Sequence, residues 1–209
     1  MRIGHALAIG IVLTLPPPID RAAAAPLRIE PKGPYVHRGT GFVFPERAGD
    51  FRRTSIIEYD DEATDVSAGY SYAVPTPERT TIATVYVYPV PPVADTADPA
   101  ARKAQQDRFC REHFDTIKAE VAEKHRSTVV VEESKVASPS PNHRQPGLRA
   151  AFTFEDVFRG KEQPLRSEAR LFCHVDGQWL IAYRFTAPAG HDLSPDIARL
   201  TAALPWPRQ

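Results

Sequence analysis

The chain has 209 residues, of which 42% are hydrophobic and 25% are charged, a composition typical of one globular domain. Its 26 basic residues balance its 26 acidic residues, so the formal net charge is zero at pH 7. A neutral chain without interleaved basic and aromatic residues lacks the electrostatic footprint of a nucleic-acid binder, and we exclude that class of function.

The first 24 residues have the three parts of a cleaved signal peptide. Arg2 supplies a positive charge, Ala6 to Leu15 form an apolar run of ten, and Ala22-Ala23-Ala24 offers small residues to signal peptidase. Ten helical residues reach only about half of the roughly 30 Å of a bilayer core. We therefore expect cleavage after Ala24, no transmembrane segment, and a periplasmic or secreted protein. The alternative is a disordered or buried N-terminus.

The mature chain is expected to be one domain with a short lead-in. Residues 25–41 are rich in proline and glycine, which predicts an irregular lead-in to a single α+β domain over residues 42–209. Alternating apolar residues and β-branched residues predict strands at the start of that domain. These strands cover residues 42–51 (broken at Pro45 and Gly49), 53–59, 65–73 and 80–88.

One long helix is predicted after these strands. Asp98 is a suitable N-cap and Pro99 a suitable first residue, and the helix is expected to run to about Arg126. An apolar stripe at helical spacing marks the side that packs on the sheet. The stripe consists of Phe109, Cys110, Phe114, Ile117 and Val121.

Strands are predicted again over residues 128–136, 148–158, 165–175 and 178–186. Asp176-Gly177 is a strong signal for a two-residue hairpin turn, which pairs residue 171 with 182, 173 with 180 and 175 with 178. A short C-terminal helix is expected to be capped by Ser194, to start at Pro195 and to bury Ile197, Leu200 and Leu204.

The predicted hairpin has no polar face. One face carries Leu171, Cys173, Val175, Leu180 and Ala182, and the other carries Phe172, His174, Trp179, Ile181 and Tyr183. In the strand over residues 80–88, Tyr86 and Tyr88 likewise oppose Val85 and Val87. A sheet with two apolar faces has to be covered twice. We therefore predict a three-layer α/β/α sandwich around a mainly antiparallel sheet, with the long helix on one face and the short C-terminal helix on the other. A two-layer arrangement that leaves one aromatic face for a ligand is the alternative.

Four segments carry a resemblance to a known group of proteins. "GFVFPERAGDFRR", "DVSAGYSY", "TVYVYPV" and "GQWLIAYRFTAP" resemble segments of uncharacterised exported bacterial proteins, and the order of elements resembles the Mog1/PsbP-like fold. Members of that wider fold mostly act as protein-binding or assembly factors. The resemblance therefore implies a binding role, and it carries no catalytic residues.

Cys110 and Cys173 are expected to form a disulfide. Cys110 lies on the apolar stripe of the helix and Cys173 on one face of the hairpin, so the two thiols meet if that helix packs on that face. An exported protein would oxidise such a pair. The alternative is two free cysteines, either buried as small hydrophobic residues or lying on opposite faces.

The motifs favour binding over catalysis. Seven histidines show no metal-ligand spacing, and the acidic turn at Asp60, Asp61, Glu62 and Asp65 lacks the spacing of a calcium loop. We assign no catalytic residue, metal ligand or cofactor, and we predict a non-catalytic binding or assembly module whose partner is a protein or an envelope component. The candidate partner or ligand surface is aromatic: Tyr70, Tyr72, Tyr86, Tyr88, His174, Trp179 and Tyr183. The alternative is a periplasmic, hydrolase-like enzyme with a site near His174, to which Asp65 and Ser67 would contribute.

Overall fold

The computed structural model describes residues 25–91 and 97–207, so the predicted signal peptide over residues 1–24 lies outside the described residues. The described elements, in chain order, are β1 (Leu27–Ile29), β2 (Tyr35–Val36), β3 (Val43–Phe44), β4 (Arg47–Ala48), β5 (Phe51–Glu58), β6 (Val66–Tyr72), β7 (Ile82–Pro89), α1 (Pro99–Lys124), β8 (Arg126–Val136), β9 (Gly147–Phe158), β10 (Lys161–Val175), β11 (Trp179–Pro188) and α2 (Ser194–Ala203).

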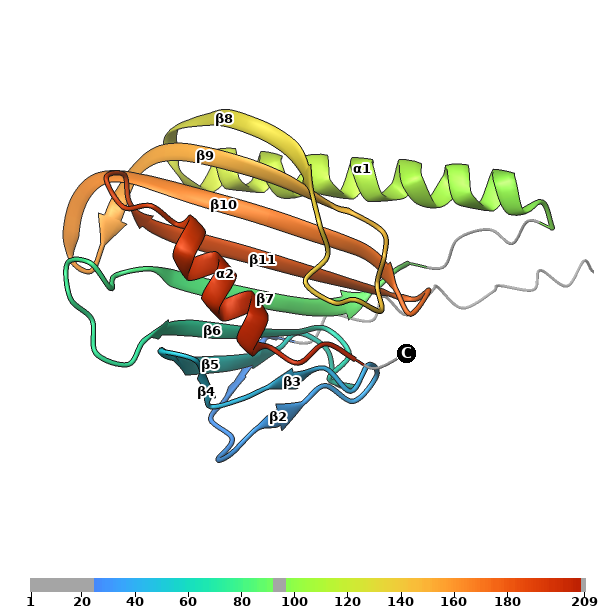
Figure 1. The fold of residues 1–209 in the computed structure, drawn as a ribbon, viewed down its shortest axis with the longest axis horizontal. Helices are drawn as coiled ribbons and strands as arrows, with labels where there is room; N and C mark the ends of the chain where they lie inside the picture. The colour runs from blue at the N-terminus through green and yellow to red at the C-terminus, as the bar shows by residue number, and fades with distance from the viewer. Residues whose placement is uncertain (1–24, 92–96, 208–209) are drawn as a thin grey trace, which may run out of the picture.

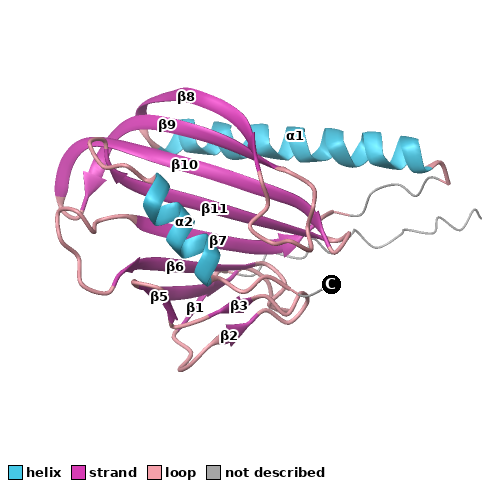
Figure 2. Ribbon diagram, in the orientation of Figure 1, coloured by secondary structure: helices cyan, strands magenta, loops and turns pink. Residues whose placement is uncertain are grey.

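A large antiparallel sheet dominates the fold. Within the described residues it contains nine strands in the order β1-β5-β6-β7-β11-β10-β9-β8, with β4 paired to β5 beside this path. β2 and β3 form a separate two-stranded ribbon near the β5 end of the sheet (Figures 1 and 2). The C-terminal hairpin strand β11 pairs with β7, and this pairing joins the strands that precede α1 to the strands that follow it. The α+β class predicted from the sequence is therefore confirmed.

Local signals define α1 as predicted. The Asp98 side chain accepts a hydrogen bond from the Ala100 N–H (2.9 Å), and Pro99 occupies the first helical position, where a missing N–H costs nothing. The buried residues of the helix are Cys110, Phe114 and Val121, which belong to the predicted stripe. The stripe sets which side of α1 packs on the sheet.

Both faces of the sheet bury apolar side chains. Val85 and Val87 of β7 are fully buried in one core, which α2 completes with Ile197, Leu200 and Leu204. Tyr86 and Tyr88 are half-buried against a second core, which α1 completes with Cys110, Phe114 and Val121. Because successive strand residues point to opposite faces, the two cores lie on opposite sides of one sheet. The opposing faces predicted for this strand are confirmed.

The two helices cover different halves of the sheet. α1 packs over β8, β9 and β10, whereas α2 lies on the opposite face in front of β7 and β11 (Figure 1). Where the face that carries α2 extends over β9 and β10, ion pairs replace apolar contacts: Glu168 meets Arg149 (2.8 Å) and Arg170 (2.7 Å). The described chain is thus an antiparallel sheet with one long and one short helix, and each helix leaves part of its face open.

Cys110 and Cys173 are joined in a disulfide. Their Cα atoms are 6.0 Å apart and 63 positions apart in the sequence. The bond ties the first half of α1 to β10, next to Leu171 and Leu180 in the core on the α1 side. The predicted pairing is confirmed, and with it the docking of α1 on the Leu171 face.

The hairpin between β10 and β11 differs from its prediction. Residue 171 pairs with 182 as expected, but Val175 pairs with Trp179, and the register shifts between Phe172 and Val175. The turn has three residues (176–178), and a bulge with positive φ at His174 (55°) precedes it. The two-residue turn was therefore wrong, and the bulge moves Val175 into the core with α2 while His174 contacts α1.

Two smaller expectations also need correction. α2 begins at Ser194 itself, its N-cap residue is Leu193, which offers no side-chain cap, and the Ser194 N–H donates to Oδ1 of Asp192 (3.0 Å). The lead-in over residues 25–41 is not wholly irregular, because β1 pairs with β5 and β2 pairs with β3. Backbone pairing with a neighbouring strand orders these segments although their own sequence has little strand propensity.

Candidate ligand-binding pocket

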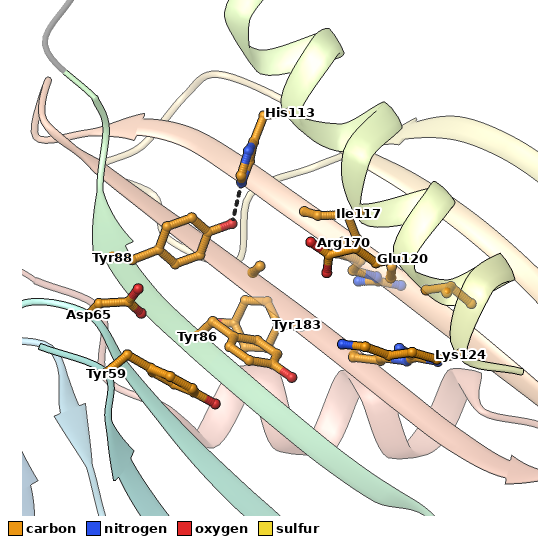
Figure 3. Close-up of a pocket in the computed structure, with 14 residues that line it drawn as sticks. Tyr59, Asp65, Tyr86, Tyr88, His113, Ile117, Glu120, Lys124, Arg170 and Tyr183 are labelled. Atoms are coloured by element: carbon orange, nitrogen blue, oxygen red, sulfur yellow. Dashed lines mark hydrogen bonds between the residues drawn. The ribbon is translucent and has the colours of Figure 1, made fainter. Parts of the chain in front are cut away.

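A pocket of about 410 Å³ lies between α1 and the sheet. We call it the α1–β7 pocket. Its residues are Tyr59, Asp65, Tyr86, Tyr88, His113, Ile117, Glu120, Val121, Lys124, Ala169, Arg170, Ala182, Tyr183 and Arg184. Figure 3 shows Tyr59, Asp65, Tyr86 and Tyr88 along the strand side and His113, Glu120 and Lys124 along the helix side. The volume falls within the range of about 300–1,000 Å³ that small-molecule sites occupy.

Small side chains explain why this space is not filled. Ala169 of β10 and Ala182 of β11 are buried beneath α1, where longer apolar residues would close the gap between helix and sheet. Further along the same face, Leu171 and Leu180 fill that gap. The pocket therefore opens where the sheet residues under α1 change from leucine to alanine, at the side of the helix that faces β7.

Asp65 places a carboxylate in the pocket without a partner. It precedes β6, is half-buried, and its side chain makes no hydrogen bond or ion pair with a described residue. Burial, with a smaller contribution from the nearby Asp60 charge, raises the pKa of Asp65 to about 6. At neutral pH the folded protein therefore holds a partly desolvated negative charge at this place.

Two of the three tyrosines on the strand side of the pocket have their hydroxyl groups bonded by the protein. Tyr88 Oη bonds His113 Nε2 (2.8 Å), and Tyr59 Oη bonds Ser67 Oγ (3.1 Å). Burial raises the pKa of both Tyr86 and Tyr88, so these groups stay neutral phenols at neutral pH. The three tyrosines therefore offer uncharged aromatic rings to a ligand.

Arg184 places an unpaired positive charge in the same pocket. Its guanidinium donates to Nε2 of His125 (2.8 Å), so Nδ1 of His125 carries the proton and donates to Asp156 (2.5 Å). Arg184 makes no ion pair with a described residue, and burial lowers its pKa although Tyr86 and Glu120 act in the opposite direction. The His125 contact fixes the guanidinium without neutralising it.

The helix side adds further polar groups. His113 is half-buried, and burial lowers its pKa, so it is a neutral partner of Tyr88 at neutral pH. Glu120 and Lys124, one turn apart on α1, are exposed at the rim. Arg170 pairs with Glu168, so the pocket is left with two acidic residues, Asp65 and Glu120, and two basic residues, Arg184 and Lys124. Asp65 lies among the tyrosines of the strand side, and Glu120 and Lys124 lie on the helix side.

The structure divides the predicted aromatic surface. Tyr86 and Tyr88 line the α1–β7 pocket, and Tyr183 adjoins it from the opposite core. Tyr70 and Tyr72 are 1% and 3% exposed in the core with α2, where their hydroxyl groups donate to Pro45 O (3.1 Å) and to Asp196. The seven residues therefore do not form one continuous surface.

Trp179 and His174 lie apart from the α1–β7 pocket. Trp179 packs edge-on against His37, with ring centroids 5.1 Å apart, and above Gly39, where a Cβ atom would come within 2.2 Å of the indole. His174 Nε2 donates to Gln106 O (3.3 Å) on α1. Both residues have packing roles in these contacts.

The fold does not bring together His174, Asp65 and Ser67, the residues of the alternative hydrolase-like site. Ser67 contacts Tyr59, Asp65 lies in the α1–β7 pocket, and His174 contacts Gln106 and Phe109 of α1. In the acidic turn, the Asp60 carboxylate accepts from the N–H groups of Thr64 (2.7 Å) and Asp65 (3.1 Å). Across residues 25–91 and 97–207, no three His, Cys, Asp or Glu side chains gather in a way that could hold a metal ion.

Sequence reasoning missed Arg184 and Tyr59. Arg184 continues the Leu180 and Ala182 face of β11, so a charge on an apolar face was the available signal. Tyr59 carried no signal, because its role depends on β5 and β7 lying on either side of β6. His113, on the helix, had no sequence feature that paired it with Tyr88.

Comparisons with known proteins add no family. No protein-family model matches the chain, and no curated protein matches it. None of the helices in the described part of the chain is long and apolar enough to span a bilayer.

Proposed function

We propose that this protein is an exported, non-catalytic binding module of the bacterial envelope, and that its ligand group occupies the α1–β7 pocket. One observation carries the proposal: Asp65 and Arg184 are opposite charges, both partly desolvated, in one pocket, and neither is paired with the other or with another described charge. Removing a charge from water without a partner is unfavourable, so such groups are retained where a ligand completes them.

Binding accounts for the pocket better than catalysis does. A hydrolytic site needs a nucleophile, a base and an orienting group within hydrogen-bond reach of each other. Here His113 is occupied by Tyr88, and Ser67 by Tyr59. The groups left for a ligand are the charges of Asp65, Glu120, Lys124 and Arg184 and three aromatic rings, an arrangement suited to recognition.

Export is part of the proposal. The disulfide between Cys110 and Cys173 is compatible with a periplasmic or extracellular location, since such compartments maintain disulfides. The disulfide and the signal-peptide-like sequence of residues 1–24 together support export, cleavage after Ala24 and a function in the envelope. A protein or another envelope component would then present the group that enters the pocket.

We also propose that the domain is a three-layer α/β/α sandwich related to the Mog1/PsbP-like proteins. The two cores on opposite faces of the sheet, one completed by α1 and one by α2, support three layers. The order of strands, long helix, strands and short helix supports the relationship. In this description both outer layers are incomplete, and the pocket lies at the edge of the α1 layer.

Native mass spectrometry of protein recovered from the periplasm tests the function. We expect a mass that corresponds to a chain starting at Ala25, with the disulfide formed, plus a non-covalent adduct. Ala182→Leu extends a side chain into the pocket floor and is expected to abolish the adduct. Ala104→Leu adds the same atoms at an exposed position of α1 and should retain it.

Two outcomes would overturn the proposal. An adduct that survives Ala182→Leu would place the ligand elsewhere, and a ligand-free wild-type protein would remove the evidence for occupancy. Thermal melting of each variant shows whether the adduct is lost from folded protein, because overpacking by three carbons costs about 1–3 kcal/mol.

A further inference from the structure

Resting on the proposed function, we propose that the ligand of the α1–β7 pocket is a small zwitterionic group of the phosphocholine type. Its methylated ammonium would lie against Tyr59, Tyr86 and Tyr88 beside Asp65, and its anionic group would meet Arg184 and Lys124. Two features support this ligand: Asp65 and Arg184 place opposite charges in one pocket, and tyrosine rings lie beside Asp65.

The cationic part follows from the strand side of the pocket. Tyr88 and Tyr59 lie on either side of Asp65, and Tyr86 follows on the same side of the pocket (Figure 3). An aromatic ring attracts a cation at its face, and several rings beside a carboxylate form the usual receptor for an organic ammonium. An anionic group at this end would instead meet the Asp65 charge without a donor to offset it.

Methylation of the ammonium follows from the balance of acceptors and rings at this end. A primary ammonium needs three hydrogen-bond acceptors. The hydroxyl groups of Tyr59 and Tyr88 are already bonded to Ser67 and His113. Asp65 is the one carboxylate that lines the pocket at this end, whereas three aromatic rings are present. A trimethylammonium group needs no acceptors, and its methyl groups pack on ring faces.

The anionic part follows from the basic side. Arg184 retains free N–H donors after its contact with His125, and a guanidinium binds phosphate oxygens in pairs. Lys124 lines the same pocket and is exposed at its rim. An anion here would pair with Arg184, on which Glu120 acts without forming an ion pair. A cation alone would leave the Arg184 charge unpaired.

Isothermal titration at pH 8 with phosphocholine, choline and phosphoethanolamine tests the inference. We expect phosphocholine to bind at least about tenfold more tightly than either of the others, a difference of about 1.4 kcal/mol. Equal or tighter binding of phosphoethanolamine would overturn the methylated cation, and equal binding of choline would overturn the anionic subsite.

Variants assign the two ends of the ligand. Asp65→Asn should weaken both choline and phosphocholine by about tenfold or more, whereas Asp61→Asn, an exposed carboxylate of the same turn, should change neither. Arg184→Met should remove the advantage of phosphocholine while choline binding persists, and persistent choline binding shows that the pocket is folded. Unchanged phosphocholine affinity in both pocket variants would overturn the assignment.

The group could arrive free or as a lipid headgroup, and a flotation assay distinguishes the two. Co-flotation with phosphatidylcholine vesicles, lost on Asp65→Asn, would identify a headgroup. Binding of free phosphocholine without co-flotation would identify a soluble molecule. Failure to bind any of these probes, while the pocket-dependent adduct persists in native mass spectra, would overturn the ligand class alone. Loss of both signals would overturn the binding function as well.

Discussion

Asp65 is the residue on which the functional account depends. Nearby carboxylates have partners: Asp60 is bonded by Thr64 and the Asp65 N–H, and Asp156 by His125. Asp65 has none among the described side chains, and its raised pKa reports the cost of holding its charge in a partly desolvated place. A group that costs stability and serves no packing role is expected to serve binding.

The substitution Asp65→Asn is predicted to stabilise the protein at pH 7 and to have no effect at pH 3. The folded-state pKa of about 6 lies above the unfolded value of 3.8, so stability falls as the pH rises through about 6. The full difference corresponds to roughly 3 kcal/mol, which solvent screening of this partly exposed group reduces to about 1 kcal/mol. Urea unfolding at both pH values measures it.

Asp61→Asn is the matched control, because Asp61 is exposed in the same turn. It should leave the free energy of unfolding unchanged at either pH. A loss of stability in Asp65→Asn at pH 7 would show that the carboxylate holds the fold together, and would contradict a binding role.

Residue-level sequence reasoning located the tyrosines of the pocket better than its charges. Tyr86 and Tyr88 stood out because two aromatic residues share one face of a short strand. Arg184, Asp65 and Tyr59 lie on β11, before β6 and after β5, and only the strand order brings them together. Charge in a pocket is a tertiary property, so no local pattern could predict it.

At the scale of elements, the Cys110–Cys173 bond holds α1 on the sheet. Replacing both cysteines by alanine is predicted to lower the free energy of unfolding by about 4 kcal/mol, because the bond closes a loop of 63 residues in the unfolded chain. Urea unfolding measures the loss. Reduction of the wild-type protein should lower the free energy of unfolding by the same amount, and a reductant should not affect the double variant. A loss under about 1 kcal/mol would show that the bond hardly constrains the unfolded chain.

Asp196 anchors α2 in a comparable way. Its carboxylate is 1% exposed, accepts hydrogen bonds from Tyr72 and Thr81, and contacts His191 (2.8 Å) and Arg199. Burial alone would raise its pKa, but hydrogen bonds from Thr81, Tyr72 and His191 outweigh burial, and the pKa lies below its ordinary value. The ionised group therefore stabilises the docking of α2.

The substitution Asp196→Ala is predicted to cost roughly 3–5 kcal/mol at pH 7, because it leaves buried donors unpaired. The loss should shrink as the pH falls below 3.8, since a lowered folded-state pKa adds stability only above the unfolded value. Thermal and urea unfolding across pH 3–7 test this. Asp107→Ala, which removes an exposed pair with Lys103 on α1, should cost at most about 0.5 kcal/mol. Equal losses in the two variants would contradict the anchoring role.

Elements were predictable where their causes are local. The Asp98 cap, Pro99 and the apolar stripe define α1 within its own sequence, and the stripe also predicted the partner of Cys110. The β10–β11 turn was not predictable, because His174 leaves the ladder to contact α1 while Val175 joins the core with α2. The bulge directs one residue towards α1 and the next towards α2, and the hairpin sequence alone does not contain the positions of these helices.

At the scale of the whole molecule, the offset between the helices creates the site. α1 covers β8 to β10 and α2 packs on the opposite face, so each face of the sheet keeps an uncovered part. On the face with α2 that part is closed by ion pairs around Glu168. On the face with α1 it remains open beside β7, and the α1–β7 pocket forms at the boundary. The sequence predicted that two apolar faces require two helices, but not that each helix would cover only part of its face.

The central claim is that an ammonium-bearing ligand lies among the tyrosines of this pocket. The most direct test is an isotope-filtered nuclear Overhauser experiment on the labelled protein with unlabelled phosphocholine. We predict contacts from the trimethylammonium protons to the ring protons of Tyr59, Tyr86 and Tyr88, absent in Asp65→Asn. Contacts to aromatic residues outside the pocket, such as Phe109 or Trp179, or no intermolecular contacts at all, would contradict the account.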